Sequence, residues 1–186
     1  MSKQTGKVMA WFVMGVFLLG AGCGLNQPAL GQKGPLPGSK PPVITGYYSP
    51  EKGRYGDVLK IYIVAEDPDG DMLRIATQVS QVGIGTYPTH WLYLKGEHRQ
   101  RFIGYLQWNT FSGRAGDLPE WTQIKIYVTV LDKWGNESNQ VVLPYTFVSG
   151  SVSFPPVPAP FDQTGVPRLG HIDISLVNPY QEGNST

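Results

Sequence analysis

The alternation of apolar and polar residues across residues 58–79 constrains the fold more than any other feature of the sequence. Within 59–65, apolar side chains fall on one face and Lys60 and Tyr62 on the other, which is the period of two of a half-buried β-strand. The apolar set is Leu59, Ile61, Ile63 and Ala65. An acidic turn at 66–71 follows, and a second alternating segment leaves it. This pattern predicts a small antiparallel sheet protein.

Turn signals divide residues 43–148 into seven segments with strand periodicity. We expect strands at 43–48, 57–65, 72–81, 91–95, 101–108, 122–131 and 140–148. In the last of these Pro144 falls on the outward set, and a proline there fits an edge strand because it cannot donate a hydrogen bond to a neighbour. So many short strands predict an all-β fold, an antiparallel immunoglobulin-like β-sandwich with Pro-rich flanks.

Length and charge limit the number of domains and the kinds of partner. A chain of 186 residues with 41% hydrophobic content can bury one core of ordinary size, so we expect one folded domain. Charged residues make up 16% of the chain and the net charge is +1. A charge so close to neutral predicts no concentrated positive surface that would attract a polyanion, so we expect no nucleic-acid partner.

The first residues have the organisation of an export signal. Lys3 and Lys7 precede an uncharged run at 8–22, which is short for a bilayer span of about 20 apolar residues. We therefore expect a signal helix at 1–22. There are two alternatives to a lipoprotein signal. One is an uncleaved membrane anchor, and the other is an ordinary signal followed by an incidental buried thiol at Cys23.

Residues 19–23, Leu-Gly-Ala-Gly-Cys, resemble the lipobox of bacterial lipoproteins. Ala21 and Gly22 match its small residues, whereas Gly20 stands where leucine is usual. The resemblance implies cleavage before Cys23, lipidation of Cys23 and attachment to a membrane. The protein would then be exported and anchored in the bacterial cell envelope, as an outer-membrane or periplasm-facing lipoprotein. Gly24 after the cysteine would permit sorting to an outer membrane, by resemblance to enterobacterial lipoproteins.

Two Pro-rich segments flank the expected sandwich at 43–148. Residues 23–42 hold the cysteine and a flexible spacer, because they contain many Pro and Gly and almost no apolar periodicity. Residues 149–186 form a Pro-rich linker and a last alternating segment at 171–178. That strand either returns to an edge of its own sheet or is given to a neighbouring chain, and we expect the return.

Residues 64–73 and 128–138 resemble segments of bacterial immunoglobulin-like, cadherin-like and PKD-like extracellular modules. The first reads Val-Ala-Glu-Asp-Pro-Asp-Gly-Asp-Met-Leu, and the second contains Leu-Asp-Lys-Trp-Gly-Asn. The resemblance implies an immunoglobulin-like fold over about the span 43–148. Such modules serve as spacers, adhesins and carbohydrate-binding appendages, so the resemblance indicates fold more than function.

Five oxygen-bearing residues form a candidate calcium site. Asp67, Asp69 and Asp71 offer carboxylates at alternate positions, and calcium takes about six to eight oxygen ligands from flexible loops. In the fold that the chain resembles, the loop with Asp132 and Asn136 emerges at the same end of the sandwich. The alternative is that Asp-Pro-Asp-Gly is a favourable turn and nothing more. We expect no other cofactor.

Exposed aromatic residues form a second candidate site. Trp91 and Trp134 are the strongest candidates for a ligand-binding surface, since Trp134 lies at an expected loop tip. The alternative is that strands simply use aromatic residues in their cores and edge pairs. The histidines show no metal-binding spacing, and no nucleophile elbow or phosphate-binding glycine loop is present, so we expect no enzyme activity.

Together these features predict a noncatalytic cell-envelope lipoprotein whose immunoglobulin-like head is a structural or adhesive interaction module. Its expected partners are the membrane, through lipid on Cys23, and an envelope protein or glycan. One alternative is a carbohydrate-binding module that uses the exposed aromatic residues. Another is an accessory subunit of an envelope complex that docks by its C-terminal strand.

Overall fold

The computed structural model describes residues 37–113 and 115–180. The expected signal at 1–22, the lipidated Cys23 and the first part of the spacer lie outside the described residues. Within the two described ranges, no helix has the length and apolar character needed to cross a bilayer.

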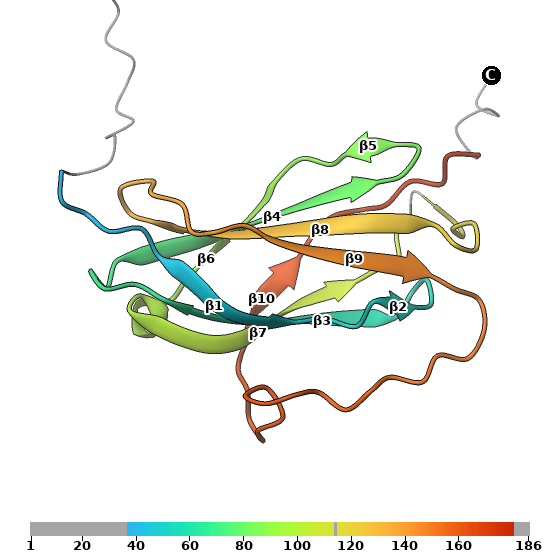
Figure 1. The fold of residues 1–186 in the computed structure, drawn as a ribbon. Helices are drawn as coiled ribbons and strands as arrows, with labels where there is room; N and C mark the ends of the chain where they lie inside the picture. The colour runs from blue at the N-terminus through green and yellow to red at the C-terminus, as the bar shows by residue number, and fades with distance from the viewer. Residues whose placement is uncertain (1–36, 114, 181–186) are drawn as a thin grey trace, which may run out of the picture. The chain divides into compact units, whose positions relative to one another are not determined.

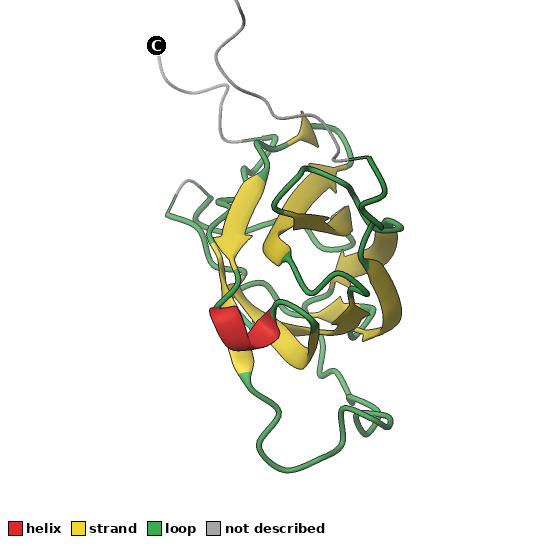
Figure 2. Ribbon diagram, turned by 90° about the vertical axis from the view of Figure 1, so that its left-hand side faces the viewer, coloured by secondary structure: helices red, strands yellow, loops and turns green. Residues whose placement is uncertain are grey.

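Two β-sheets pack face to face in the folded head (Figure 1). Sheet A has the order β1 (Val43–Tyr48), β3 (Val58–Glu66), β7 (Arg101–Asn109), β10 (Arg168–Ile172). Sheet B has the order β2 (Lys52–Gly53), β9 (Val141–Phe147), β8 (Gln123–Asp132), β4 (Met72–Gln81), β5 (Gly85–Thr86), and β6 (His90–Tyr93) also pairs with β4. Figure 2 shows the sheets from the side, with the helical turn η1 (Gly96–His98) between β6 and β7.

The seven strands expected from periodicity are confirmed, most of them to within a residue or two. Burial follows the alternation: in β3, Leu59, Ile61 and Ile63 are buried while Lys60 is exposed. The inward residues of both sheets form one core, as two half-buried sheets require. The all-β immunoglobulin-like sandwich is therefore the fold of the described chain.

The sheets are mainly antiparallel, as expected, but each also contains one parallel pair of strands, which was not predicted. β2 pairs with β9 in parallel, and β10 pairs with β7 in parallel. Only three residues separate β1 from β2, so the chain changes from sheet A to sheet B without reversing and meets β9 in the same direction (Figure 1). β10 follows a long connection that leads from sheet B back to the edge of sheet A.

The sandwich continues beyond the expected boundary at residue 148. The expected strand at 171–178 appears as β10 at Arg168–Ile172, followed by an irregular segment whose Ile174 and Leu176 are buried in the core. Trp108 Nε1 donates to the Ile174 carbonyl at 3.0 Å. A side-chain donor of this kind gives a hydrogen bond to a backbone carbonyl that has no partner in a neighbouring strand. The expected intramolecular return of the C-terminal strand is confirmed by its pairing with β7.

Candidate functional site

The β3–β4 turn and the β8–β9 hairpin lie together at one end of the sandwich. Met72 is in register with Asp132, and the Lys133 amide donates to the Asp71 carbonyl at 3.1 Å. The five residues of the candidate calcium site therefore belong to two adjacent loops.

Asp67 is buried and closes the β3–β4 turn. Its two carboxylate oxygens accept the amides of Asp69 at 3.0 Å and Asp71 at 3.2 Å. Burial raises the pKa of the Asp67 carboxyl, the two amide donors oppose this rise, and the neighbouring Asp71 carboxylate adds to it. The group is therefore harder to ionise than an exposed aspartate.

Asp71 and Asp132 link the two loops in different ways. Asp71 Oδ2 lies 3.2 Å from Lys133 Nζ, while its Oδ1 is buried and has no hydrogen-bond partner among the described residues. Asp132 Oδ1 accepts the amides of Trp134 at 2.8 Å and Asn136 at 2.9 Å. Asp132 Oδ2 accepts from Asn136 Nδ2 at 2.6 Å. Asp132 thus supports its own hairpin, in the way that aspartates commonly organise turns.

Among the described residues, no group of three His, Cys, Asp or Glu side chains is placed to hold a metal ion. Calcium binding stays a prediction, and the unpartnered Asp71 Oδ1 beside Asp67 is the observation that favours it. A cation there would compete with the Lys133 ammonium for Asp71.

We predict that calcium raises the unfolding temperature of the protein, because a ligand that binds only the folded state stabilises it by mass action. Thermal unfolding with calcium and with a chelator measures the effect. Asp71→Asn is the control variant that should abolish it, because a neutral amide is a weaker ligand. An identical unfolding temperature in calcium and in chelator would contradict the prediction.

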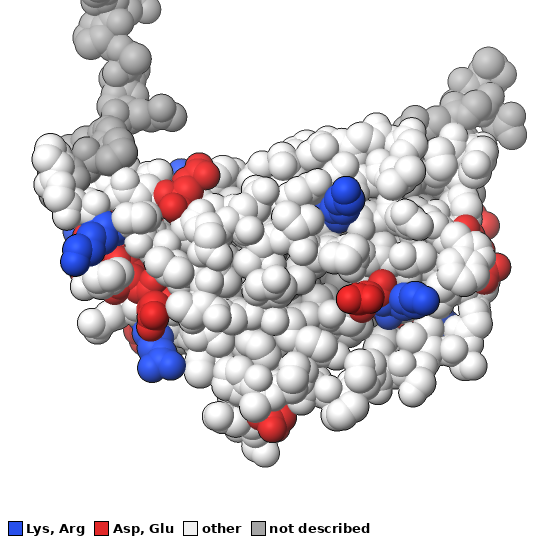
Figure 3. Space-filling model, in the orientation of Figure 1, with Lys and Arg blue, Asp and Glu red and all other residues white. Residues whose placement is uncertain are grey.

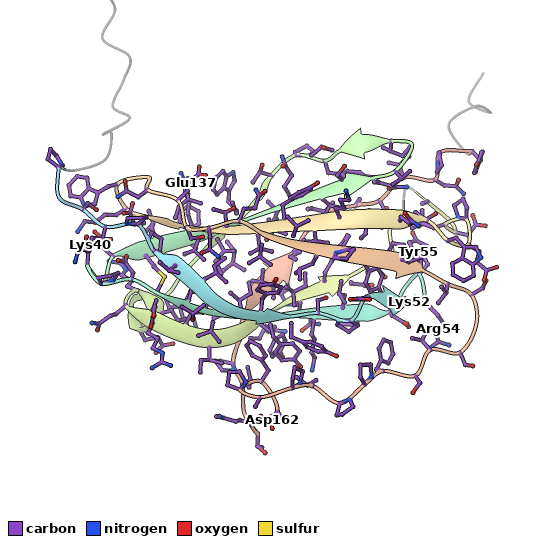
Figure 4. The ribbon with its side chains drawn as sticks, in the orientation of Figure 1. Lys40, Lys52, Arg54, Tyr55, Glu137 and Asp162 are labelled. Carbon is purple, nitrogen blue, oxygen red and sulfur yellow. The ribbon has the colours of Figure 1, made fainter. Side chains whose placement is uncertain are left out.

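A small depression lies on the outer face of sheet B, with a volume of about 160 Å³. The side chains that line it come from β4, β6 and the preceding Thr89, β8 and the β8–β9 hairpin. They include Trp91, Tyr127, Gln78, Glu137 and Gln140. Figure 4 shows Glu137 on this outer side of the sheet.

A larger groove of about 550 Å³ follows the seam between β1 of sheet A and β9 of sheet B. Tyr47, Val142 and Phe154 line it with exposed apolar surface. Glu51 and Lys52 are the charged residues in its lining. Figure 3 shows the molecule in the same orientation as Figure 1, with few charged side chains over its middle.

The two predicted ligand-binding tryptophans do not belong to one surface. Trp91 is 42% exposed and lines the depression. Trp134 is half-buried at the tip of the β8–β9 hairpin, where its ring lies 5.3 Å from Lys133 Nζ and it lines neither the depression nor the groove. Gln78 and Gln140, whose side-chain amides line the depression with Trp91, were not identified from the sequence. The alternation of residues 72–81, which puts Gln78 on the outward face of β4, was the signal that could have identified Gln78.

Comparison with known proteins gives no family assignment. No family model matches the sequence, and no curated protein matches it. One similar solved structure is the PKD domain of an M14-like peptidase from Thermoplasmatales archaeon SCGC AB-540-F20, with a TM-score of 0.36 and 18% identity, covering 60% of this chain and 99% of that one. Another is the CARDB domain of a Pyrococcus furiosus protein in complex with di-metal ions, with a TM-score of 0.32 and 11% identity, covering 57% and 92%. Both are immunoglobulin-like β-sandwich domains.

Proposed function

We propose that this protein is a noncatalytic interaction module of the cell envelope, held at a membrane by lipid on Cys23 and binding a protein partner through the groove between β1 and β9. The spacer at 23–42 would let the head stand clear of the membrane surface. The observation that carries the proposal is the open seam between two strand edges.

The seam is closed at both ends and open between them. At one end, the Asn139 side chain accepts from the Ile44 amide at 2.8 Å and donates to the Ile44 carbonyl at 3.1 Å. At the other end, β2 pairs with β9 at Thr146 and Phe147. Among the described strands, β1 has β3 as its single neighbour, and β9 has no second neighbour before Thr146.

This arrangement fits an extended peptide segment better than a compact ligand. Free strand edges offer unpaired amide and carbonyl groups, to which an extended peptide adds as a further strand. Tyr47 and Val142 are 55% and 45% exposed, so apolar side chains of a partner would gain buried area there. Pro144 lacks an amide and would confine such pairing to part of the edge.

The accessory-subunit alternative needs a free C-terminal strand, and β10 already pairs with β7 in its own chain. We therefore propose the seam, and not the C-terminal strand, as the binding site of the partner.

Site-specific photo-crosslinking in intact cells tests the proposal. A photoreactive amino acid replaces Val142 in the groove or, as the matched control, Val82, which is 67% exposed in the turn after β4. We expect a light-dependent adduct of one defined mass from position 142 and none from position 82. Fractionation of the same cells should recover the wild-type protein with the membranes. The Cys23→Ser variant should instead be recovered in the soluble fraction. Equal adducts from both positions would contradict the groove, and an unchanged distribution of Cys23→Ser would contradict the anchor.

A further inference from the structure

We propose that the depression around Trp91 on the outer face of sheet B binds a neutral pyranose sugar. This is a second site, since no residue lines both the depression and the groove between β1 and β9. It therefore goes beyond the proposed protein-binding function and does not depend on it.

Strand register creates the hollow. Ala76 of β4 lies between Trp91 of β6 and Thr129 of β8, its partners on the two sides. The small alanine leaves space between larger neighbours. Two residues further along the same face, Gln78 lies opposite Tyr127. Glu137, which forms an isolated bridge with Leu131, brings the β8–β9 hairpin into the lining of the depression.

The Trp91 ring is braced from outside the depression. The Arg74 guanidinium lies 4.1 Å from the ring centroid, and Arg74 is not among the residues that line the depression. No carboxylate pairs with Arg74 in the described chain. A cation held against a tryptophan face limits the motion of the ring. An aromatic surface that is already ordered loses little entropy when a ligand stacks on it.

The polar lining suits the hydroxyl groups of a sugar. Gln78 and Gln140 each supply an amide that donates and accepts, and Glu137 supplies two acceptor oxygens. Sugar hydroxyls also donate and accept, and the C–H face of a pyranose ring stacks on an aromatic ring. The charged side chain in the lining is Glu137, whose carboxylate disfavours phosphates and acidic sugars.

The size and polarity of the site separate it from an ordinary solvated sheet face. Its volume of about 160 Å³ is below the roughly 300–1,000 Å³ of pockets for drug-sized ligands, so it would hold a single ring. Thr129 points outward from β8 yet is only 6% exposed, because the surrounding side chains cover it. An ordinary outer face would expose such a residue.

Titration of the intact protein with neutral oligosaccharides tests the inference. The probes are glucose-, galactose-, mannose- and N-acetylglucosamine-based oligomers, measured by saturation-transfer NMR and by calorimetry at millimolar sugar. We expect saturable binding of at least one class. Trp91→Ala and Ala76→Leu should each weaken it by at least about tenfold, as removal or blockage of a central contact does.

Tyr93→Ala is the matched control, because Tyr93 is on the same strand, is 66% exposed and does not line the depression. Its affinity should equal that of the wild type, and thermal melts should show that all three variants are folded. Flat titrations with all four classes, or unchanged affinity in Trp91→Ala, would overturn the inference. Crosslinking at Val142 in the Ala76→Leu variant separates the two sites, because it should persist when sugar binding is lost.

Discussion

Replacement of Gly53 by alanine is expected to destabilise the head by about 3 kcal/mol, at the upper end of the cost of overpacking a core. An added Cβ at Gly53 would overlap the Tyr145 hydroxyl oxygen and lie 3.0 Å from Tyr145 Cζ. Tyr145 cannot move aside easily, because it is 2% exposed and packs edge-on against Phe147 with ring centroids 5.0 Å apart. The Gly53 carbonyl also accepts the Val148 amide at 3.0 Å, which holds the backbone in place.

The environment of Tyr145 supports the same expectation. Burial, with a smaller contribution from the charge of Asp57, raises the pKa of Tyr145 to about 12. The raised pKa and the 2% exposure of Tyr145 both follow from its burial in the core.

Chemical denaturation measures the change in the free energy of unfolding, and two variants make the result specific. Gly96→Ala is the matched control, because no atom lies within 4 Å of its added Cβ. Tyr145→Phe in the Gly53→Ala background removes the overlapping oxygen and should recover part of the lost stability. The steric explanation fails if Gly53→Ala costs no more than Gly96→Ala.

A chain that ends at residue 160 is expected to lose cooperative unfolding altogether. It would lack β10 and the core side chains of Ile172, Ile174 and Leu176, which are 5%, 8% and 0% exposed. Loss of one such side chain typically costs about 2–5 kcal/mol. The truncation would also leave the buried donors Trp108 Nε1 and Gln81 Nε2 without their carbonyl acceptors, at about 1–3 kcal/mol each. Together these losses reach the whole stability of a typical domain, about 5–15 kcal/mol.

Circular dichroism melts and size-exclusion chromatography measure this outcome. A chain that ends at residue 180 is the control, because it keeps every described contact and should melt like the full chain. Leu176→Ala provides an intermediate case, with an expected loss of about 3 kcal/mol and a cooperative transition. A sharp, unshifted melt of the chain ending at residue 160 would show that 43–148 folds alone.

The sequence alone determined where the main strands lie. Alternation is a local property, because each inward residue of a half-buried strand must be apolar whatever strand lies beside it. For this reason 43–48 and 72–81 were predicted with the bounds that β1 and β4 have. The resemblance of 64–73 and 128–138 to extracellular modules also placed Asp71 and Asp132 in adjacent loops, although their hydrogen bonds and the ion pair with Lys133 depend on loop geometry.

Only the tertiary structure decided which strands become neighbours and what their outward side chains form. β2 and β5 have two residues each and therefore carry no periodicity, and the parallel pairing of β2 and β10 depends on where the chain crosses between sheets. The depression around Trp91 likewise requires Ala76 and Thr129 to share a register with it. Register between distant segments is a property of the assembled sheet, because the same alternating pattern permits several pairings and packing of the whole core selects one.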